Sequence, residues 1–197
     1  MIDIDLLLSW GATYKKTGSN ETIFREGSEA HFYHQLVSGS VKCVNINDDG
    51  GEFIQDLIEP GECFGEFPLF DLGIYAVTAV TEKESVILRL NKSTFQQILR
   101  EHHEIHMEFT RLFIERLRFK FLLLKELSCF GPEHRISTLF SYLKENKKNF
   151  CNKCNKVQLT RQQIANMTGL RVETVIRSIK HLEEKGSVTI DKGKVYC

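Results

Sequence analysis

The sequence predicts an α+β protein in which a β-rich N-terminal region is followed by a long helix and a small helical domain. Three observations support this fold class. Glycines recur about every ten residues between Gly18 and Gly73, with β-rich segments between them. From Asn91 onward the apolar residues recur at three and four residues instead. Near the C-terminus, Gly169 separates two short amphipathic segments with the spacing of a helix-turn-helix.

Length and composition are those of a globular protein. With 197 residues the chain can bury a core in one large domain or two small ones. No stretch is apolar for long enough to span a bilayer, and residues 1–10 carry acidic but no basic side chains, unlike a secretory signal. We therefore expect a cytoplasmic protein without a membrane partner.

The β-rich region predicts a jelly roll or sandwich, because its short strands are regularly spaced. The turn Asp48-Asp-Gly-Gly51 predicts a hairpin, since Asp-Gly supplies the positive φ values that such a turn needs. We place this domain at residues 1–103. The expected strands are residues 21–25, 31–37, 40–46, 52–58, 75–80 and 85–90.

A capped helix at residues 91–99 and a long helix at 104–129 follow. We place the long helix in a separate segment, residues 104–130. Its apolar residues cover more than one side. One interpretation is a helix sandwiched within its own domain; the other, which we favour, is a helix that packs on the roll and pairs with a twofold mate. The residues expected at the dimer contact are Phe109, Leu112, Phe113, Leu117, Leu123 and Leu124.

The C-terminal third, residues 131–197, is basic. It holds 13 Lys and Arg against 6 Asp and Glu, whereas residues 1–130 hold 13 against 20. This division predicts a polyanion-binding domain attached to an acidic body. Pro132 suits the first turn of a helix and Glu133 suits its positive end, so a helix begins at this boundary.

The two segments around Gly169 predict a helix pair that reads DNA. Thr160 can cap the first helix, with Gln163 completing a capping box. On the second helix Glu173 and Arg177 lie outward, four residues apart. Arginine can donate twice to guanine, and a carboxylate can accept from cytosine N4. The alternative is an ordinary surface ion pair, but the basic context favours DNA.

These segments resemble the CRP/FNR superfamily of bacterial regulators over nearly the whole chain. The resemblance rests on residues 24–27, 36–41 and 60–70 in the first half and on 159–165 and 170–177 in the second. It implies a double-stranded β-helix (jelly-roll) sensor domain, a long dimerisation helix and a winged helix-turn-helix. A homodimer on a pseudo-palindromic site in double-stranded DNA is expected, with RNA polymerase as a further partner.

The resemblance also assigns roles to residues. Glu173 and Arg177 occupy the two principal base-reading positions, and the start of the first helix contacts phosphate. Arg171 stands where the family often has a capping Ser or Thr, which loses about 0.5–2 kcal/mol of capping and offers a phosphate contact instead. The expected DNA-binding residues are Thr160, Arg161, Gln162, Arg171, Glu173, Thr174, Arg177, Ser178 and Lys180.

The expected effector is a small molecule of unknown identity rather than cyclic AMP. In the cyclic-AMP-binding branch a Gly-Glu pair is followed, about ten residues later, by an Arg-Ser pair that holds the phosphate. Here Gly65-Glu66 is present, but Ala76 and Val77 stand at the matching positions. A buried phosphate without its Arg is costly. The expected effector pocket is Phe64, Gly65, Glu66, Phe67, Ala76, Val77, Arg116 and Lys120.

The remaining signals are weaker. Cys151 and Cys154 form the only CxxC, and two sulfurs do not close a zinc site, so we predict no cofactor and no metal. A metal- or redox-responsive regulator that uses this pair stays an alternative, with Cys197 as a third ligand if the C-terminal strand returns nearby. His102 and His106 share a helical face but suit a solvated helix start.

Two other classes of protein are weighed against a DNA-binding regulator. A ligand-binding regulatory module would share the roll but would lack the basic helix pair. An enzyme is not expected, because the sequence has no Gly-rich phosphate loop, no GxSxG and no HExxH.

Overall fold

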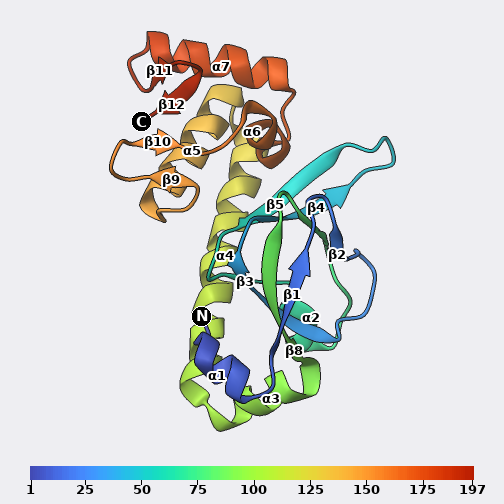
Figure 1. Cartoon of the computed structure of the whole chain (residues 1–197). Coiled ribbons are helices and arrows are strands. Elements are labelled where there is room, and N and C mark those ends of the chain that lie inside the picture. The colour runs from blue at the N-terminus through green and yellow to red at the C-terminus, as the bar shows by residue number, and fades with distance from the viewer. The chain divides into compact units, whose positions relative to one another are not determined.

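The computed structural model describes residues 1–197, which form two compact units, Met1–Glu115 and Arg116–Cys197. Figure 1 shows the predicted order of elements: a β-rich N-terminal unit, a long helix and a C-terminal helix pair with short strands. The α+β fold class is confirmed. None of the helices combines the length and the apolar character that crossing a membrane requires.

The N-terminal unit contains two four-stranded antiparallel sheets. The first has the order β1 (Thr13–Thr17), β8 (Ser85–Asn91), β3 (Phe32–Ser38), β6 (Cys63–Phe64). The second has the order β2 (Thr22–Phe24), β7 (Thr78–Thr81), β4 (Val41–Ile46), β5 (Glu52–Ile58). All six predicted strands are present, although β7 begins three residues later than expected.

Local chemistry explains the turns and the small helices of this unit. Gly50 has the positive φ, +78°, that the turn between β4 and β5 needs. Two short helices, α1 (Ile4–Ser9) and α2 (Phe67–Asp71), were not predicted from the sequence. The Asp3 carboxylate caps α1 by accepting from the backbone N–H groups of Asp5 and Leu6.

The helices that follow the roll share its core. The Tyr33 ring stacks on Phe95 of α3 (Lys92–Glu101), with ring centroids 4.7 Å apart. Phe109, on α4 (His103–Cys129), meets both rings edge to face at 6.0 and 5.4 Å. Burial of large aromatic rings in such pairs stabilises a core beyond the area alone, so the first half of α4 belongs to the roll.

This packing changes the expected dimer contact. Phe109 is 3% exposed and belongs to the core of the roll, and Leu112 and Phe113 are half-buried against the same core. Leu123 is half-buried. Only Leu117 and Leu124 of the expected set are exposed. Some apolar residues of α4 pack on the core and others are exposed, and the helical period alone does not distinguish the two groups. The exposed apolar residues of α4 are Met107, Ile114, Leu117, Phe121, Leu124 and Leu127.

The second half of α4 is fixed to α5 (Pro132–Glu145). The Phe119 ring stacks on Tyr142 with centroids 3.5 Å apart. The Arg135 guanidinium donates to the carbonyls of Glu126, Leu127 and Phe130, at 3.2, 2.8 and 3.0 Å. These bonds satisfy carbonyls that the end of a helix otherwise leaves without a partner.

The rest of the second unit combines a helix-turn-helix with a small sheet. After α5 come β9 (Phe150–Cys151), β10 (Lys156–Val157), α6 (Arg161–Thr168) and α7 (Val172–Glu184). The chain ends in the hairpin of β11 (Thr189–Asp191) and β12 (Lys194–Tyr196), and the sheet has the order β11-β12-β10-β9. α7 packs against both α5 and α6. The terminal hairpin is the wing that the resemblance implied.

Candidate nucleic-acid interface

α6 begins at a capping box, as the sequence predicted. The Thr160 hydroxyl accepts from the Gln163 backbone N–H at 3.1 Å, and the Gln163 side chain accepts from the Thr160 N–H at 2.9 Å. Gly169, with φ +65°, ends the helix in the left-handed conformation. The turn to α7 therefore follows from three residues whose chemistry the sequence displays.

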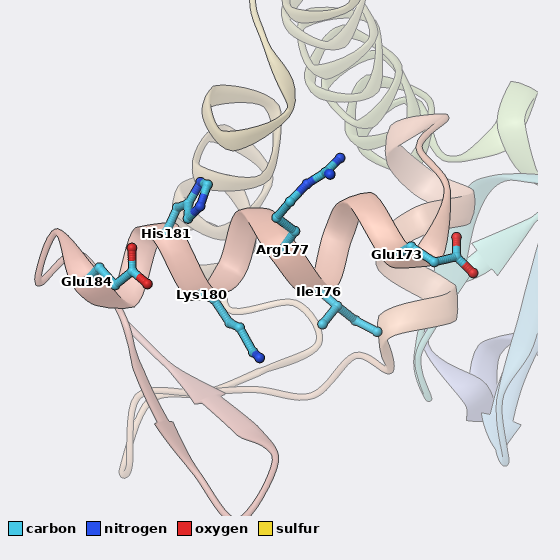
Figure 2. A pocket seen from close by; sticks show the side chains of 6 residues that line it. All are labelled: Glu173, Ile176, Arg177, Lys180, His181 and Glu184. Atoms are coloured by element: carbon cyan, nitrogen blue, oxygen red, sulfur yellow. The ribbon is translucent and has the colours of Figure 1, made fainter.

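α7 has one buried and one exposed side. Val175, Ile179 and Leu182 are 0–6% exposed and form its inward side. Its exposed side forms a shallow, open hollow, seen in Figure 2, where all six labelled side chains come from α7 alone. We name this side the reading face; its residues are Glu173, Ile176, Arg177, Lys180, His181 and Glu184.

The structure brings Glu173, Arg177 and Lys180 together on the reading face, but it does not place Ser178 there. Ser178 is 5% exposed and lies on the inward side of α7. This burial contradicts the expectation that Ser178 contacts DNA. Ser178 lies three residues after Val175 and four before Leu182, so the helical period places it on the packed side of α7. Thr174 is half-buried at the edge of the face.

The reading face also contains a residue that was not predicted from the sequence. Ile176 is 43% exposed, although it is apolar, and it lies between Glu173 and Arg177 in the chain. An apolar side chain there can contact the methyl group of thymine. The apolar period alone does not reveal this exposure, because Ile176 lies four residues after Val172 and three before Ile179, a spacing that also suits the inward side.

Charges at the far end of α7 are partly paired. The Glu133 carboxylate at the start of α5 accepts from Lys185 at 2.6 Å and lies 2.9 Å from the His181 ring nitrogen. These two partners hold the pKa of Glu133 below its usual value. The pairing ties α5 to α7 and leaves Arg177 and Lys180 as the cations in the middle of the reading face.

The residues expected at phosphate lie at the starts of the two helices. Thr160 and Gln162 are exposed at the start of α6, and Arg161 is half-buried there. Arg171 is exposed at the N-cap of α7 and makes no side-chain capping bond. Its guanidinium is thus available where the helix N-terminus also favours an anion.

The expected effector pocket is only partly assembled in the roll. Phe64 and Glu66 are buried, whereas Phe67 and Ala76 are exposed and Val77 is half-buried on the loop before β7. Arg116 and Lys120 lie in the half of α4 that belongs to the second unit. The place beside Gly65-Glu66 is occupied by side chains that were not expected in it.

Aromatic rings pack directly on Gly65. The Phe24 and Tyr75 rings stack with centroids 3.7 Å apart and planes 7° apart. A Cβ atom on Gly65 would lie 2.4 Å from Phe24 and 2.9 Å from Tyr75, so only glycine fits beneath them. Burial, aided by the Glu66 charge, raises the pKa of the Tyr75 hydroxyl to about 12.

His34 completes this aromatic cluster. It is 4% exposed, and its ring lies 5.4 Å from Phe64 and 5.6 Å from Phe24. Burial and the positive charges of Arg89 and Lys15 lower its pKa to about 3. The imidazole is therefore neutral at neutral pH, and its Nδ1 atom has no hydrogen-bond partner.

Comparisons with known proteins agree with the architecture of both units. Residues 14–102 match the cyclic nucleotide-binding domain family, and residues 134–196 match the Crp-like helix-turn-helix domain. The chain belongs to the CRP/FNR family of transcription regulators. Its relatives are regulators rather than enzymes, as the sequence predicted.

Individual relatives cover almost the whole chain. The cAMP-activated global transcriptional regulator CRP of Haemophilus influenzae is 28% identical over 189 residues, 93% of this chain and 84% of that protein. The cyclic AMP receptor protein of Thermus thermophilus is 26% identical over 194 residues, 98% of this chain and 87% of that protein. Among solved structures, the c-di-GMP-responsive global regulator CLP of Xanthomonas campestris has a similar fold, with a TM-score of 0.77 at 19% identity over 98% of both chains.

Proposed function

We propose that two copies of this CRP/FNR-family regulator bind a pseudo-palindromic DNA site, with α7 of each copy in the major groove. The observation that carries the proposal is the reading face, where Glu173 and Arg177 stand exposed one turn apart while the opposite side of the helix is buried. Half-sites centred about one helical turn, roughly 34–36 Å, apart suit a twofold dimer.

The residues of the helix pair divide into two roles. Arg177 donates to guanine O6 and N7, and Glu173 accepts from cytosine N4, which gives base preference. The phosphate contacts come from the starts of the two helices and from the rest of α7. The residues are Thr160, Arg161, Gln162, Arg171, Thr174 and Lys180. Phosphate contacts fix position without reading sequence.

A second copy of the chain is the proposed partner of α4. Its exposed residues Ile114, Leu117, Phe121 and Leu124 are spaced three, four and three residues apart, which is the pattern of a two-stranded coiled-coil seam. Each is between 46% and 62% exposed in one copy, so pairing removes a continuous apolar stripe from water. RNA polymerase is the protein partner that we propose beyond the second copy.

The proposed effector is an apolar or aromatic small molecule rather than cyclic AMP, or there is none. Ala76 is exposed and carries no charge for a phosphate. The Phe24 and Tyr75 rings already lie against Gly65, where a ligand would meet the Gly-Glu pair. The name of the Haemophilus relative describes activation by cAMP for that protein; the residues that differ here argue against it for this chain.

Binding-site selection tests the reading helix. The wild type is expected to select a pseudo-palindrome, and Arg177→Ala should lose about 1–3 kcal/mol per half-site and relax the preference at one G·C pair. Lys180→Ala is the matched control, because losing a phosphate contact weakens binding to all sequences alike and flattens its dependence on salt. An unchanged consensus for Arg177→Ala would refute the assignment of α7 as the reader.

A further inference from the structure

The hairpin of β9 and β10 holds the two thiols of the CxxC sequence at a tight turn. Cys151 pairs with Lys156 across the hairpin, which closes a loop of residues 152–155. Asn155 adopts φ +54° and so turns the chain back into β10. Cys151 and Cys154 are three positions apart, and the Cα atoms of the first and fourth residues of a β-turn lie within about 7 Å of each other. The turn therefore brings Cys151 and Cys154 to one side of the loop.

Backbone N–H groups of the turn are directed at both sulfur atoms. Cys151 Sγ accepts from the N–H groups of Lys153 and Cys154, and it is hydrogen-bonded to the Cys154 thiol. Cys154 Sγ accepts from the N–H of Lys156. Such bonds stabilise negative charge on sulfur and orient it.

We propose that Cys151 and Cys154 chelate a thiophilic divalent cation of the Zn²⁺ or Cd²⁺ class. Two sulfurs that bind one tetrahedral ion at about 2.3 Å lie about 3.8 Å apart, which is the separation expected of two sulfurs already joined by a hydrogen bond. The pair is accessible, since Cys154 is exposed and Cys151 is half-buried. Thiolates are the ligands that such ions prefer.

The site has two protein ligands rather than three. Cys197 returns beside the hairpin, where its N–H donates to the Asn155 carbonyl at 3.0 Å. No group of three His, Cys, Asp or Glu side chains converges anywhere in the chain, however. The remaining positions on the ion are therefore left to water or small ligands, and the affinity is below that of a closed four-ligand zinc site.

Titration of the reduced, full-length protein with Cd²⁺ tests the proposal through the ultraviolet charge-transfer absorption of thiolate-bound cadmium. One ion per chain is expected. Cys151→Ser and Cys154→Ser should each weaken binding by roughly tenfold or more, since even outer ligand partners contribute that much. Cys129→Ser is the control, because Cys129 is an exposed thiol on α4 outside the hairpin, and its titration should match the wild type.

A second measurement needs no variant. Cd²⁺ should protect Cys151 and Cys154, but not Cys129, from alkylation by iodoacetamide, as read peptide by peptide by mass spectrometry. Equal alkylation with and without Cd²⁺ would overturn the proposal, as would a Cys151→Ser, Cys154→Ser double variant that binds Cd²⁺ like the wild type. Rapid conversion of the pair to a disulfide, with no cadmium absorption from the reduced form, would also overturn it.

Discussion

The buried imidazole of His34 makes the stability of the roll depend on pH. Its pKa is about 3 in the folded protein, against 6.5 for an ordinary histidine, mainly because burial opposes the charged form. Between these two values the unfolded chain binds a proton that the folded protein does not. The contribution of His34 is therefore complete above pH 6.5 and is lost as the pH falls toward 3.

The size of the effect follows from the two pKa values. Between pH 7 and pH 5 the free energy of unfolding should fall by about 2 kcal/mol through His34 alone. Urea unfolding at the two pH values measures this for the wild type and for His34→Phe, which keeps an aromatic ring beside Phe24 and Phe64. The variant should lose most of that pH dependence, whatever its absolute stability.

Two comparisons make the test decisive. His31 is exposed, so His31→Gln is the matched control and should keep the pH dependence of the wild type. His34→Leu provides a second apolar replacement should the larger ring of phenylalanine not fit. If both apolar variants fold and show the same loss of stability between pH 7 and pH 5 as the wild type, the reasoning about His34 is refuted.

Three further predictions concern the C-terminal half and the dimer. Leu117→Glu with Leu124→Glu should give monomers in sedimentation, because charge on the α4 seam opposes its burial; a dimer would contradict the seam, and a monomeric wild type would contradict the homodimer. Ile176→Ala should lower the preference for one A·T pair in binding-site selection without changing the salt dependence; an unchanged preference would exclude a thymine contact. Thr160→Ala should lower the free energy of unfolding by about 1 kcal/mol in urea denaturation, whereas Ser at this position should not.

Local signals predicted most of the fold. The Thr160 capping box and the left-handed turn at Gly169 are each determined by residues no more than four positions apart. Both features can therefore be predicted from the local sequence. The division of the apolar residues of α4 depends on contacts with Tyr33 and Phe95, which are far away in the chain. That is why Phe109 was expected at the dimer contact and lies in the roll instead.

The side chains that lie beside Gly65-Glu66 could not be predicted from the sequence, for the same physical reason. The resemblance identified the loop positions of Gly65 and Ala76, but the rings that occupy the space come from Phe24 on β2 and Tyr75 on the loop before β7. Pairing of β2 with β7, continued by backbone hydrogen bonds of Tyr75 with Gly27 and Ser28, brings these two together. The spacing of residues within one segment cannot predict a contact between two distant segments. Phe24 nevertheless lies in one of the segments on which the family resemblance rests.

The aromatic cluster sets the condition that any effector of the roll must meet. A ligand that reaches Gly65-Glu66 has to displace Phe24, which is stacked on Tyr75 and 8% exposed. Exposing a buried phenylalanine costs about 1.5–3 kcal/mol, or roughly a tenfold to hundredfold loss of affinity, unless the ligand buries that ring again. An aromatic or apolar ligand can do so by stacking on it. A cyclic nucleotide would also bring a phosphate toward Ala76, whose side chain carries no charge to pair with it. Because a nucleobase could also stack on Phe24, the unpaired phosphate is the cost that would favour an apolar effector over a cyclic nucleotide.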